Sequence, residues 1–486
     1  MKSLTFAMTV GCLASGLFGQ SSDCSAQARL WGTYYGGTNI ENANKIATDA
    51  SGNVYVVGAT NSPDGIATPN GFDSVLDISV EPSQGYLAKF NPSGMLVWAT
   101  YYGDAQGNWG EGEGASVADL GLDASGNVYI VGTVVCPSQG LATPGAHDMS
   151  CDEVDAFVAK FSPSGKRLWG TYFGGDEDDT GQALSVMPTG EIYVAGYTHS
   201  AHGLALGASK DASFGGLYDG YVAKFNAQGQ LIWSRYYGGE DYDFVTDIAC
   251  KRPNLLSADI CFITGLTEST NSIASVGAHD TVRNGDDAFV ARLDTNGIRL
   301  WGTYYGGSGH DSARSIAVDN QLNVYVGGNT DSNRSMATLN THDVGYNGGR
   351  DMFVGKFNAI GQFIAGTYYG NSADESLEDI AVDTSGNVYV FGDVKAHGWL
   401  VTVNAYDTSF NGIGDTVIAR FNPNLTRSWA TYYGGNKIDT ASGIAVGKNN
   451  HVYVTGVTNS SDALSTAGSH QQELKAVDSF VTEFIQ

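Results

Sequence analysis

The stretch Trp31-Gly32-Thr33-Tyr34-Tyr35-Gly36-Gly37 decides the fold, because close copies of it recur along the whole chain. The position of Thr33 returns at residues 100, 171, 235, 303, 367 and 431, with Arg in place of Thr at residue 235. The intervals are 67, 71, 64, 68, 64 and 64 residues. Self-similarity at a nearly fixed period indicates a repeat architecture, so the sequence predicts seven units.

Each unit contains four β-type runs joined by turn residues. In the first unit we name them strand A (45–48), strand B (54–57), strand C (85–90) and strand D (98–102). Turn residues separate A from B at 49–53 and C from D at 91–94. None of the runs has a helical period, so one unit is expected to be a four-stranded antiparallel meander.

Seven such units predict an all-β fold, a seven-bladed β-propeller whose radial arrangement leaves only short strand edges. The seventh unit ends at Phe484-Ile485-Gln486, directly after its strand C. The chain supplies a matching orphan strand D at residues 30–37. We therefore expect the N-terminal strand to complete the C-terminal blade and close the ring, in a single domain spanning residues 29–486.

These repeats resemble a known family. The motifs that carry the resemblance are Thr-Tyr-Tyr-Gly-Gly, Ile-Ala-Val-Asp at 316–319 and 380–383, Ser-Gly-Asn-Val-Tyr-Val at 51–56 and 385–390, and Asp-Ala-Phe-Val-Ala-Lys-Phe at 155–161. Together they are similar to the SBBP-type β-propeller repeat over nearly all of residues 29–486. The resemblance implies a propeller in exported bacterial proteins and implies no particular activity. The sequence departs from the pattern at an insertion reaching Gly114, at Ala365 in a Trp position, and at 251–259.

The composition narrows the class of partner. Lys and Arg number 25 against 51 Asp and Glu, which gives a net charge of −26. Such an excess of negative charge argues against nucleic acids and anionic membranes as partners. Metal cations, basic peptides and neutral glycans remain open.

Residues 1–28 are expected to be a secretory signal peptide. Lys2 precedes an apolar run from Leu4 to Phe18, and small residues follow. Cleavage is expected after Ala28 or after Gly19, and a lipoprotein site at Cys12 is the weaker alternative. We expect a secreted protein, extracellular, at the cell surface or periplasmic, that is monomeric and has no transmembrane segment in its mature form.

The cysteines fit an exported protein. Cys12 and Cys24 leave with the leader, and the other four form two local pairs, Cys136 with Cys151 and Cys250 with Cys261. Local pairs of this kind predict disulfides outside the cytoplasm. Metal ligation is the alternative, although the chain lacks a Cys-x-x-Cys spacing.

Two acidic registers recur with the repeat. One follows the Gly-Gly ends, at Glu41, Asp179, Asp243, Asp311, Asp374 and Asp439, with Glu111 or Glu113 in the second unit. The other opens strand C, at Asp155, Asp219, Asp287, Asp351, Asp415 and Asp478, with Gln84 in the first unit. Because the D-to-A and B-to-C connections emerge at the same end of a blade, both registers are predicted to gather on one face, which would be strongly negative.

Two interpretations of these carboxylates stay open. Short acidic side chains cap exposed backbone N–H groups in turns, and a cap required once per blade would recur with the repeat. Alternatively, the carboxylates bind a ligand or a metal, of which calcium suits oxygen donors best. The densest cluster, Asp176, Asp178 and Asp179, is the metal candidate, and we expect no other cofactor.

Histidine and tryptophan divide into structural and candidate binding residues. His147, His279 and His342 occupy a loop position where other units have Phe72 and Tyr406, which predicts a packed ring rather than a catalytic base. Six of the eight Trp residues belong to the strand D repeat. The other two, Trp109 and Trp399, are candidates for stacking on a ligand, with packing between blades as the alternative.

The functional hypothesis is a secreted, non-enzymatic binding or scaffold module that uses its acidic, long-loop face to hold a protein, a glycan or a cation. The sequence has no Gly-x-Ser-x-Gly elbow, His-Glu-x-x-His motif, P-loop or dinucleotide fingerprint. The alternative is an extracellular polysaccharide hydrolase or lyase with carboxylates near the channel mouth. A quinone-cofactor or assembly propeller is a third, weaker possibility, suggested by the Pro-Ser-Gly-x-Leu-x-Trp run.

Overall fold

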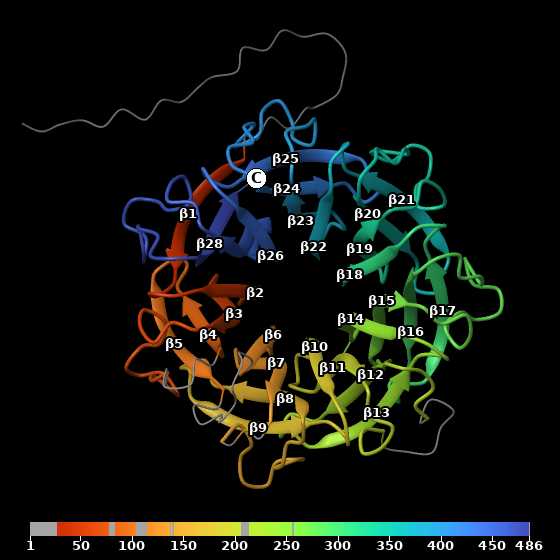
Figure 1. Cartoon of the computed structure of the whole chain (residues 1–486), viewed down its shortest axis with the longest axis horizontal. Helices are drawn as coiled ribbons and strands as arrows, with labels where there is room; N and C mark the ends of the chain where they lie inside the picture. The colour runs from red at the N-terminus through yellow and green to blue at the C-terminus, as the bar shows by residue number, and fades with distance from the viewer. Residues whose placement is uncertain are drawn as a thin grey trace, which may run out of the picture.

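The computed structural model describes residues 27–76, 83–103, 114–136, 138, 140–205, 213–254 and 257–485. The expectations for the leader, for Cys12 and Cys24, and for Trp109, Glu111 and Glu113 fall outside these residues. Within them, seven four-stranded sheets surround a central axis (Figure 1). The predicted seven-bladed β-propeller is therefore confirmed. No helix of the described chain is long and apolar enough to cross a membrane.

The first blades are built from consecutive strands. Blade 1 is β2 (Glu41–Thr48), β3 (Val54–Thr60), β4 (Gln84–Phe90) and β5 (Leu96–Tyr102). Blade 2 is β6 (Ala115–Leu122), β7 (Val128–Val135), β8 (Val154–Phe161) and β9 (Arg167–Phe173). Blade 3 is β10 (Asp179–Val186), β11 (Ile192–Thr198), β12 (Asp219–Phe225) and β13 (Leu231–Tyr237). Blade 4 is β14 (Asp243–Lys251), β15 (Ile260–Thr267), β16 (Asp287–Leu293) and β17 (Arg299–Tyr305).

The remaining blades follow the same order until the last. Blade 5 is β18 (Asp311–Val318), β19 (Val324–Thr330), β20 (Asp351–Phe357) and β21 (Phe363–Tyr369). Blade 6 is β22 (Glu375–Val382), β23 (Val388–Val394), β24 (Asp415–Phe421) and β25 (Arg427–Tyr433). Blade 7 is β26 (Asp439–Val446), β27 (Val452–Thr458), β28 (Asp478–Ile485) and β1 (Ala28–Tyr35), with a 3-10 turn at Lys448–Asn450.

The N-terminal strand closes the ring, as predicted. β1 pairs antiparallel with β28, with Trp31 opposite Glu483 and Tyr35 opposite Ser479. In Figure 1 the red first strand lies beside the blue last strand. Blade 7 therefore takes one strand from one end of the chain and three from the other.

The A-to-B turns explain the repeated Asp-x-Ser-Gly-Asn-Val-Tyr run. One oxygen of Asp49 accepts the N–H groups of Ser51 and Asn53, both at 2.9 Å. The other oxygen accepts the Asn53 amide at 2.6 Å and the Tyr55 hydroxyl at 3.2 Å. Gly52 has φ +83°, a conformation that suits glycine. The same network forms around Asp123, Asp319 and Asp383.

The two predicted disulfides are present. Cys136–Cys151 ties the end of β7 to the segment before β8. Cys250–Cys261 joins β14 to β15 and closes the connection at 251–259 that departs from the repeat. Two disulfides in one domain are typical of proteins outside the cytoplasm.

The strand D tryptophans join neighbouring blades. The indole of Trp98 lies against Gly165, where a methyl group would come within 2.7 Å of Cδ2, and Gly165 has φ +84°. The Trp98 Nε1–H donates to the Pro163 carbonyl at 3.1 Å. The same Trp-to-glycine contact pairs Trp31 with Gly94, Trp169 with Gly229, Trp233 with Gly297 and Trp301 with Gly361. Each contact docks strand D of one blade on the C-to-D turn of the next.

One junction uses a different pair of residues. Ala365 stands at the Trp position of blade 5, and Leu425 stands at the turn position that is glycine elsewhere. Leu425 is fully buried in the same apolar cluster as Ala365, and it keeps the left-handed turn conformation with φ +61°. The leucine side chain therefore fills the volume that an indole fills at other junctions, which explains the Ala365 departure.

This exchange predicts strong coupling between residues 365 and 425. Ala365→Trp alone should lower the free energy of unfolding by about 1–3 kcal/mol, because the indole would collide with Leu425. Adding Leu425→Gly should restore most of that loss, since it recreates the contact found at the other junctions. Urea unfolding of both single variants and the double variant forms a complete cycle. A double variant no more stable than Ala365→Trp would contradict the exchange.

Candidate functional site

The beginnings of strands A and C and the end of strand B lie at one end of each blade. In blade 1, Thr60 at the end of β3 is opposite both Glu41 and Gln84. The D-to-A and B-to-C connections therefore emerge on one side of the disc, which we call the long-loop face. Both acidic registers lie along it, as the sequence predicted.

Carboxylates of the first register are buried caps. One oxygen of Asp243 accepts the Gly239 N–H and the Ser269 hydroxyl, both at 2.7 Å, and the other accepts the Thr267 hydroxyl. Equivalent bonds hold Glu41, Asp179, Asp311 and Asp439. Each of the five residues is at most 1% exposed. This geometry agrees with the capping interpretation, and it leaves their proposed ligand contacts untested.

Asp374 does not occupy this register, and its placement there was wrong. Glu375 takes the position, because its Oε2 accepts the Asn371 N–H at 2.7 Å and the residue is 1% exposed. Asp374, one residue earlier, is exposed on the long-loop face. In blade 2 the equivalent position at the start of strand A is Ala115, opposite Val134.

The two registers meet in pairs at the junctions between blades. At the junction of blades 3 and 4, a methyl group on Gly238 would lie 2.4 Å from Asp219 Oδ1 and 2.8 Å from Asp243 Oδ2. Among the described residues, Asp219 Oδ1 has no hydrogen-bond partner. Similar pairs flank Gly36 (Asp478, Glu41), Gly174 (Asp155, Asp179), Gly306 (Asp287, Asp311), Gly370 (Asp351, Glu375) and Gly434 (Asp415, Asp439).

Burial weakens the negative charge of this face. Desolvation, with repulsion from the paired carboxylate, raises the pKa of Asp155 to about 8, of Asp219 and Asp287 to about 7, and of Asp415 to about 6. Several of these carboxyl groups therefore hold a proton near neutral pH. The recurrent registers supply less exposed negative charge than their number suggests.

The proposed metal cluster does not converge. Asp176 is exposed, Asp178 is half-buried and Asp179 is a buried cap. Within the described chain, one group brings three potential metal ligands within 4.8 Å of one another, and it consists of Cys136, Cys151 and Asp155. Its cysteines form a disulfide and cannot act as thiolate ligands. Calcium binding stays a prediction.

The predicted packing role of the histidines is confirmed. The ring of His147 lies edge-on to Phe225 with centroids 6.1 Å apart, and His342 lies edge-on to Phe421 at 5.8 Å. His279 stacks on Phe363 at 4.5 Å. Trp399, by contrast, is 56% exposed in the B-to-C connection of blade 6, so it is not buried between blades.

Variable side chains form a ring on the long-loop face. At six junctions, the residue before the strand C register accepts, through its carbonyl, the N–H of the first residue of strand A. The side chains at this residue and at the one before strand A form the junction ring. Its pairs are Val477/Ile40, Ser83/Gly114, Val154/Asp178, Tyr218/Tyr242, Asp286/His310, Arg350/Asp374 and Gly414/Ile438.

Polar and aromatic side chains are unevenly distributed around the junction ring. Four successive junctions, from blades 2/3 to blades 5/6, hold Asp178, Tyr218 with Tyr242, Asp286 with His310, and Arg350 with Asp374, and we call these residues the polar arc. His310 Nδ1 lies 3.0 Å from Asp286 Oδ2. The backbone N–H of Arg350 donates to Asp374 Oδ1 at 3.1 Å. The other three junctions hold only Ile, Val, Ser and Gly. Sequence reasoning missed the arc because it treated each residue within its own unit.

An aromatic platform lies in the arc between blades 3 and 4. The rings of Tyr218, Tyr242 and Phe244 are nearly parallel, with interplanar angles of 16–29° and centroids 5.9, 5.9 and 6.2 Å apart. Tyr197 stands almost perpendicular to Phe244 at 4.8 Å. All four side chains are half-buried. None of these four residues was singled out from the sequence.

A second cluster lies on the central axis, where every strand A contributes to a hollow of about 260 Å³. Lys45 Nζ lies 2.8 Å from Asp379 Oδ1, and Asp379 also accepts the Ile444 N–H of the next blade at 2.9 Å. Asp119 and Asp247 accept the N–H groups of Leu184 and Ile316 in the same way, both at 2.8 Å. These axial carboxylates bind neighbouring blades together around one lysine.

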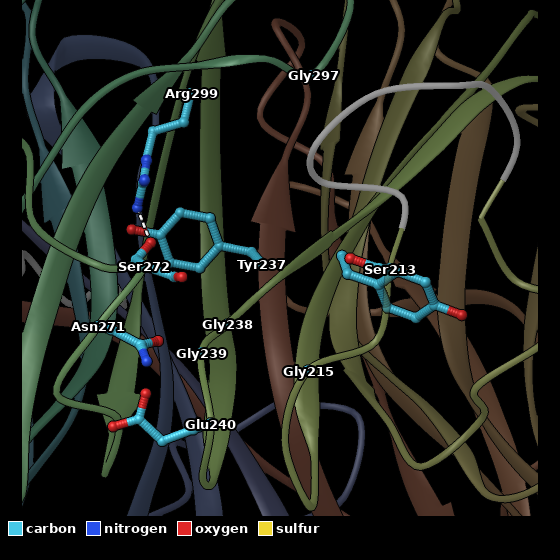
Figure 2. Close-up of a pocket in the computed structure, with 11 residues that line it drawn as sticks. Ser213, Gly215, Tyr237, Gly238, Gly239, Glu240, Asn271, Ser272, Gly297 and Arg299 are labelled. Carbon is cyan, nitrogen blue, oxygen red and sulfur yellow. Dashed lines mark hydrogen bonds between the residues drawn. The ribbon is translucent and has the colours of Figure 1, made fainter.

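A groove of about 500 Å³ lies between blades 3 and 4 on the outer side of the platform. Figure 2 shows Arg299 reaching Ser272 across it, with Tyr237 alongside, and Glu240 and Asn271 farther along. Glycine residues form much of the remaining wall. Residues 206–212, which precede Ser213, lie outside the described residues, and the groove carries no assignment.

Comparisons with known proteins agree with this architecture. The model of the SBBP family, a β-propeller repeat, matches residues 30–65 and 300–334, so the chain contains SBBP repeats. The chain is 23% identical over 372 residues to the regulatory protein FlaEY of Caulobacter vibrioides, covering 73% of this chain. It is 21% identical over 555 residues to an uncharacterized WD repeat-containing protein of Acanthamoeba polyphaga mimivirus, covering 96% of this chain. The chain spans only 36% and 38% of those two relatives.

Solved structures similar to this chain have TM-scores below one half. The Neurospora crassa Pan2 WD40 domain has a TM-score of 0.43 at 10% identity, covering 94% of both chains. A polysaccharide lyase, the PL25 ulvan lyase bound to -[GlcA(1-4)Rha3S]-, has a TM-score of 0.42 at 12% identity, covering 92% of this chain and 96% of that one. At this similarity neither carries an argument about function.

The junction carboxyl pairs predict a stability that falls as pH rises. Because folding raises their pKa values above the unfolded value near 4, their contribution is fully present below about pH 4 and is lost as pH rises toward 8. Asp219→Asn replaces the unpartnered oxygen with an amide that can donate to Asp243. It should reduce the loss of unfolding free energy between pH 5 and pH 8 by roughly 1 kcal/mol.

Urea unfolding at pH 5, 6.5 and 8 measures this effect. Asp374→Asn, which removes an exposed carboxylate from the same face, is the matched control and should leave the pH dependence of the wild type unchanged. An Asp219→Asn variant whose free energy of unfolding changes from pH 5 to pH 8 by the same amount as that of the wild type would refute the assignment.

Proposed function

We propose that this SBBP-repeat propeller is a non-enzymatic binding module that acts outside the cytoplasm and holds its ligand on the polar arc of the long-loop face. The observation that carries the proposal is the uneven distribution of polar and aromatic side chains around the junction ring. All blades have the same backbone fold, so residues needed only to maintain that fold would be similar at every junction. Aromatic, acidic and basic side chains instead gather over successive junctions, where one extended ligand would contact them together.

The burial of the recurrent carboxylates favours binding over catalysis. An acid–base pair must reach a substrate, and one member needs a raised pKa. The junction pairs meet the second condition but fail the first, since Asp219 and Asp243 are at most 1% exposed. The exposed charges of the arc, such as Arg350 and Asp374, are instead placed for contact with a ligand.

The test is a binding screen on two kinds of probe, a glycan array and an array of neutral and basic peptides, with the purified chain. Each hit is then measured with His310→Ala and Arg350→Ala. We expect either variant to weaken binding about fivefold or more, as contact residues near the centre of an interface do.

Ile40→Ala and Ile438→Ala are matched controls, because both isoleucines are similarly exposed on the opposite part of the same ring. Binding that is weakened by the isoleucine variants and unchanged by the arc variants would place the ligand elsewhere. Release of sugar products from any bound glycan would overturn the non-enzymatic assignment.

One observation favours a second candidate, acid–base chemistry on a polysaccharide. Blade 6 has Val394 and Ala396 where five other blades have the Thr and Ser that bond the register carboxylate. Glu375 Oε1 consequently has no partner among the described residues, and burial raises the pKa of Glu375 to about 8. Glu375 lines a hollow of about 600 Å³ together with Tyr346 and Arg350. A neutral carboxylic acid there suits a proton donor. Glu375 is itself 1% exposed, so this candidate requires the substrate to open the hollow around the carboxyl group.

Glu375→Gln distinguishes this candidate from simple binding. If Glu375 donates a proton, the variant should lose the release of reducing ends or unsaturated uronate from polysaccharides, typically by about 100-fold or more. Glu473→Gln, at an exposed carboxylate in the B-to-C connection of blade 7, is the control and should keep that release. No product release by the wild-type protein across the polysaccharides tested would eliminate the candidate.

A further inference from the structure

The aromatic platform stands out because the repeat supplies its own comparison. At the position of Phe244 the other blades have Asn42, Ser116, Thr180, Ser312, Ser376 and Thr440. At the position of Tyr197 they have Ala59, Thr133, Leu266, Asn329, Asp393 and Val457. At each of these two positions, the other six blades fold with mostly small or polar side chains in place of the large aromatic ring. The fold does not require these rings, and partly exposing them has a cost in free energy.

The rings form a surface rather than a cage. A column of stacked rings would give one centroid distance close to the sum of the other two. The measured distances of 5.9, 5.9 and 6.2 Å are nearly equal, and the interplanar angles do not exceed 29°. Tyr218, Tyr242 and Phe244 are therefore nearly parallel and offset from one another, not piled in one column. A cage for a quaternary ammonium needs rings that face one another across the cation, which this arrangement lacks.

The platform has a raised edge and polar neighbours. Tyr197 stands nearly perpendicular to Phe244, and His199 stacks on Tyr218 with centroids 4.9 Å apart. The Tyr242 N–H donates to Asp241, and the Tyr242 carbonyl accepts the Glu268 N–H at 2.7 Å. The nearby carboxylate of Asp178 raises the pKa of Tyr218, after the larger effect of burial. An apolar surface is thus bordered by hydrogen-bonding groups, most of them acidic.

We infer that the aromatic platform is a sugar-binding subsite that takes an uncharged or amino-substituted pyranose of a glycan chain, an inference that rests on the proposed function. A pyranose has an apolar face of C–H groups that lies flat on aromatic rings, while its hydroxyl groups project from the rim toward hydrogen-bonding partners. The neighbouring carboxylates of Asp178, Asp241 and Glu268 disfavour uronates and sulfated sugars by charge repulsion. Further sugars of the chain extend along the polar arc.

The experiment measures the purified chain against oligosaccharides of three kinds: neutral, amino-substituted and uronate-containing. Tyr218→Ala and Tyr242→Ala should each weaken binding to the neutral or amino sugars about tenfold, and Tyr218→Phe, which keeps the ring, should bind like the wild type. Tyr406→Ala is the matched control, because it removes a partly exposed tyrosine outside the platform, at the position of the packed rings. Thermal unfolding shows whether each variant is folded. If Tyr218→Ala does not fold, the binding measured for Tyr242→Ala tests the inference.

Each outcome separates this inference from the broader proposal. Glycan binding that survives both tyrosine variants but is lost in Arg350→Ala would overturn the platform and leave the binding module standing. Affinity for tetramethylammonium in place of sugars would replace the pyranose with a cation. A preference for uronates, or no sugar binding in the wild type, would also overturn the inference. If all of the arc and platform variants bind glycans as the wild type does, both the platform inference and the proposed binding site on the polar arc are overturned.

Discussion

The contact between a strand D tryptophan and a turn glycine of the next blade is the constraint on which the rest of this propeller depends. Only a glycine in the left-handed conformation lets the indole lie flat on the turn. At four of the five contacts, those of Trp98, Trp169, Trp233 and Trp301, the indole N–H also donates to a carbonyl in that turn. This contact fixes how far apart neighbouring blades stand at the rim. Apolar clusters fill the space between blades, the carboxyl pairs close it at one face, and the axial aspartates bridge it at the centre. The exchange of Trp and Gly for Ala365 and Leu425 keeps the volume of the junction while changing the residues that fill it.

The fold followed from the sequence because its signals recur. A seven-fold Thr-Tyr-Tyr-Gly-Gly period, a turn aspartate in four of the seven A-to-B hairpins and an orphan strand at residues 30–37 each point to the same ring, and a signal repeated in register is hard to misinterpret. The site did not follow, for the opposite reason. Tyr197, Tyr218, Tyr242 and Phe244 come from two blades and are each unusual only against their counterparts in other units. Comparing units column by column would have exposed them. Glu375 was missed because Asp374 precedes it and satisfies the same pattern one residue early.

Net charge proved a poor guide to surface charge. A chain with a net charge of −26 suggested a strongly negative face, yet many of its recurrent acids are buried, bonded to backbone N–H groups or protonated near neutral pH. The charges that reach solvent on the long-loop face are of both signs, as the exposed side chains of Arg350 and Asp374 show at one junction. The number of acidic residues does not show which of them cap backbone N–H groups and which can contact a ligand. An aspartate facing a buried N–H acts as a cap, whereas one facing water is free to bind.

The pairing of β1 with β28 also sets the order in which the molecule can be completed. Ala28 lies opposite Ile485, so β1 has no partner until β28 has been made. Every earlier blade can assemble as its own four strands emerge, since its contacts are local, but blade 7 must recruit a strand from the other end of the molecule. Until then, both β1 and the open side of blade 1 are exposed to other chains. Ring closure therefore depends on β28 having been made. A chain cut short before β28 leaves the ring open and exposes unpaired strand edges. Chaperones and proteases can recognise such edges.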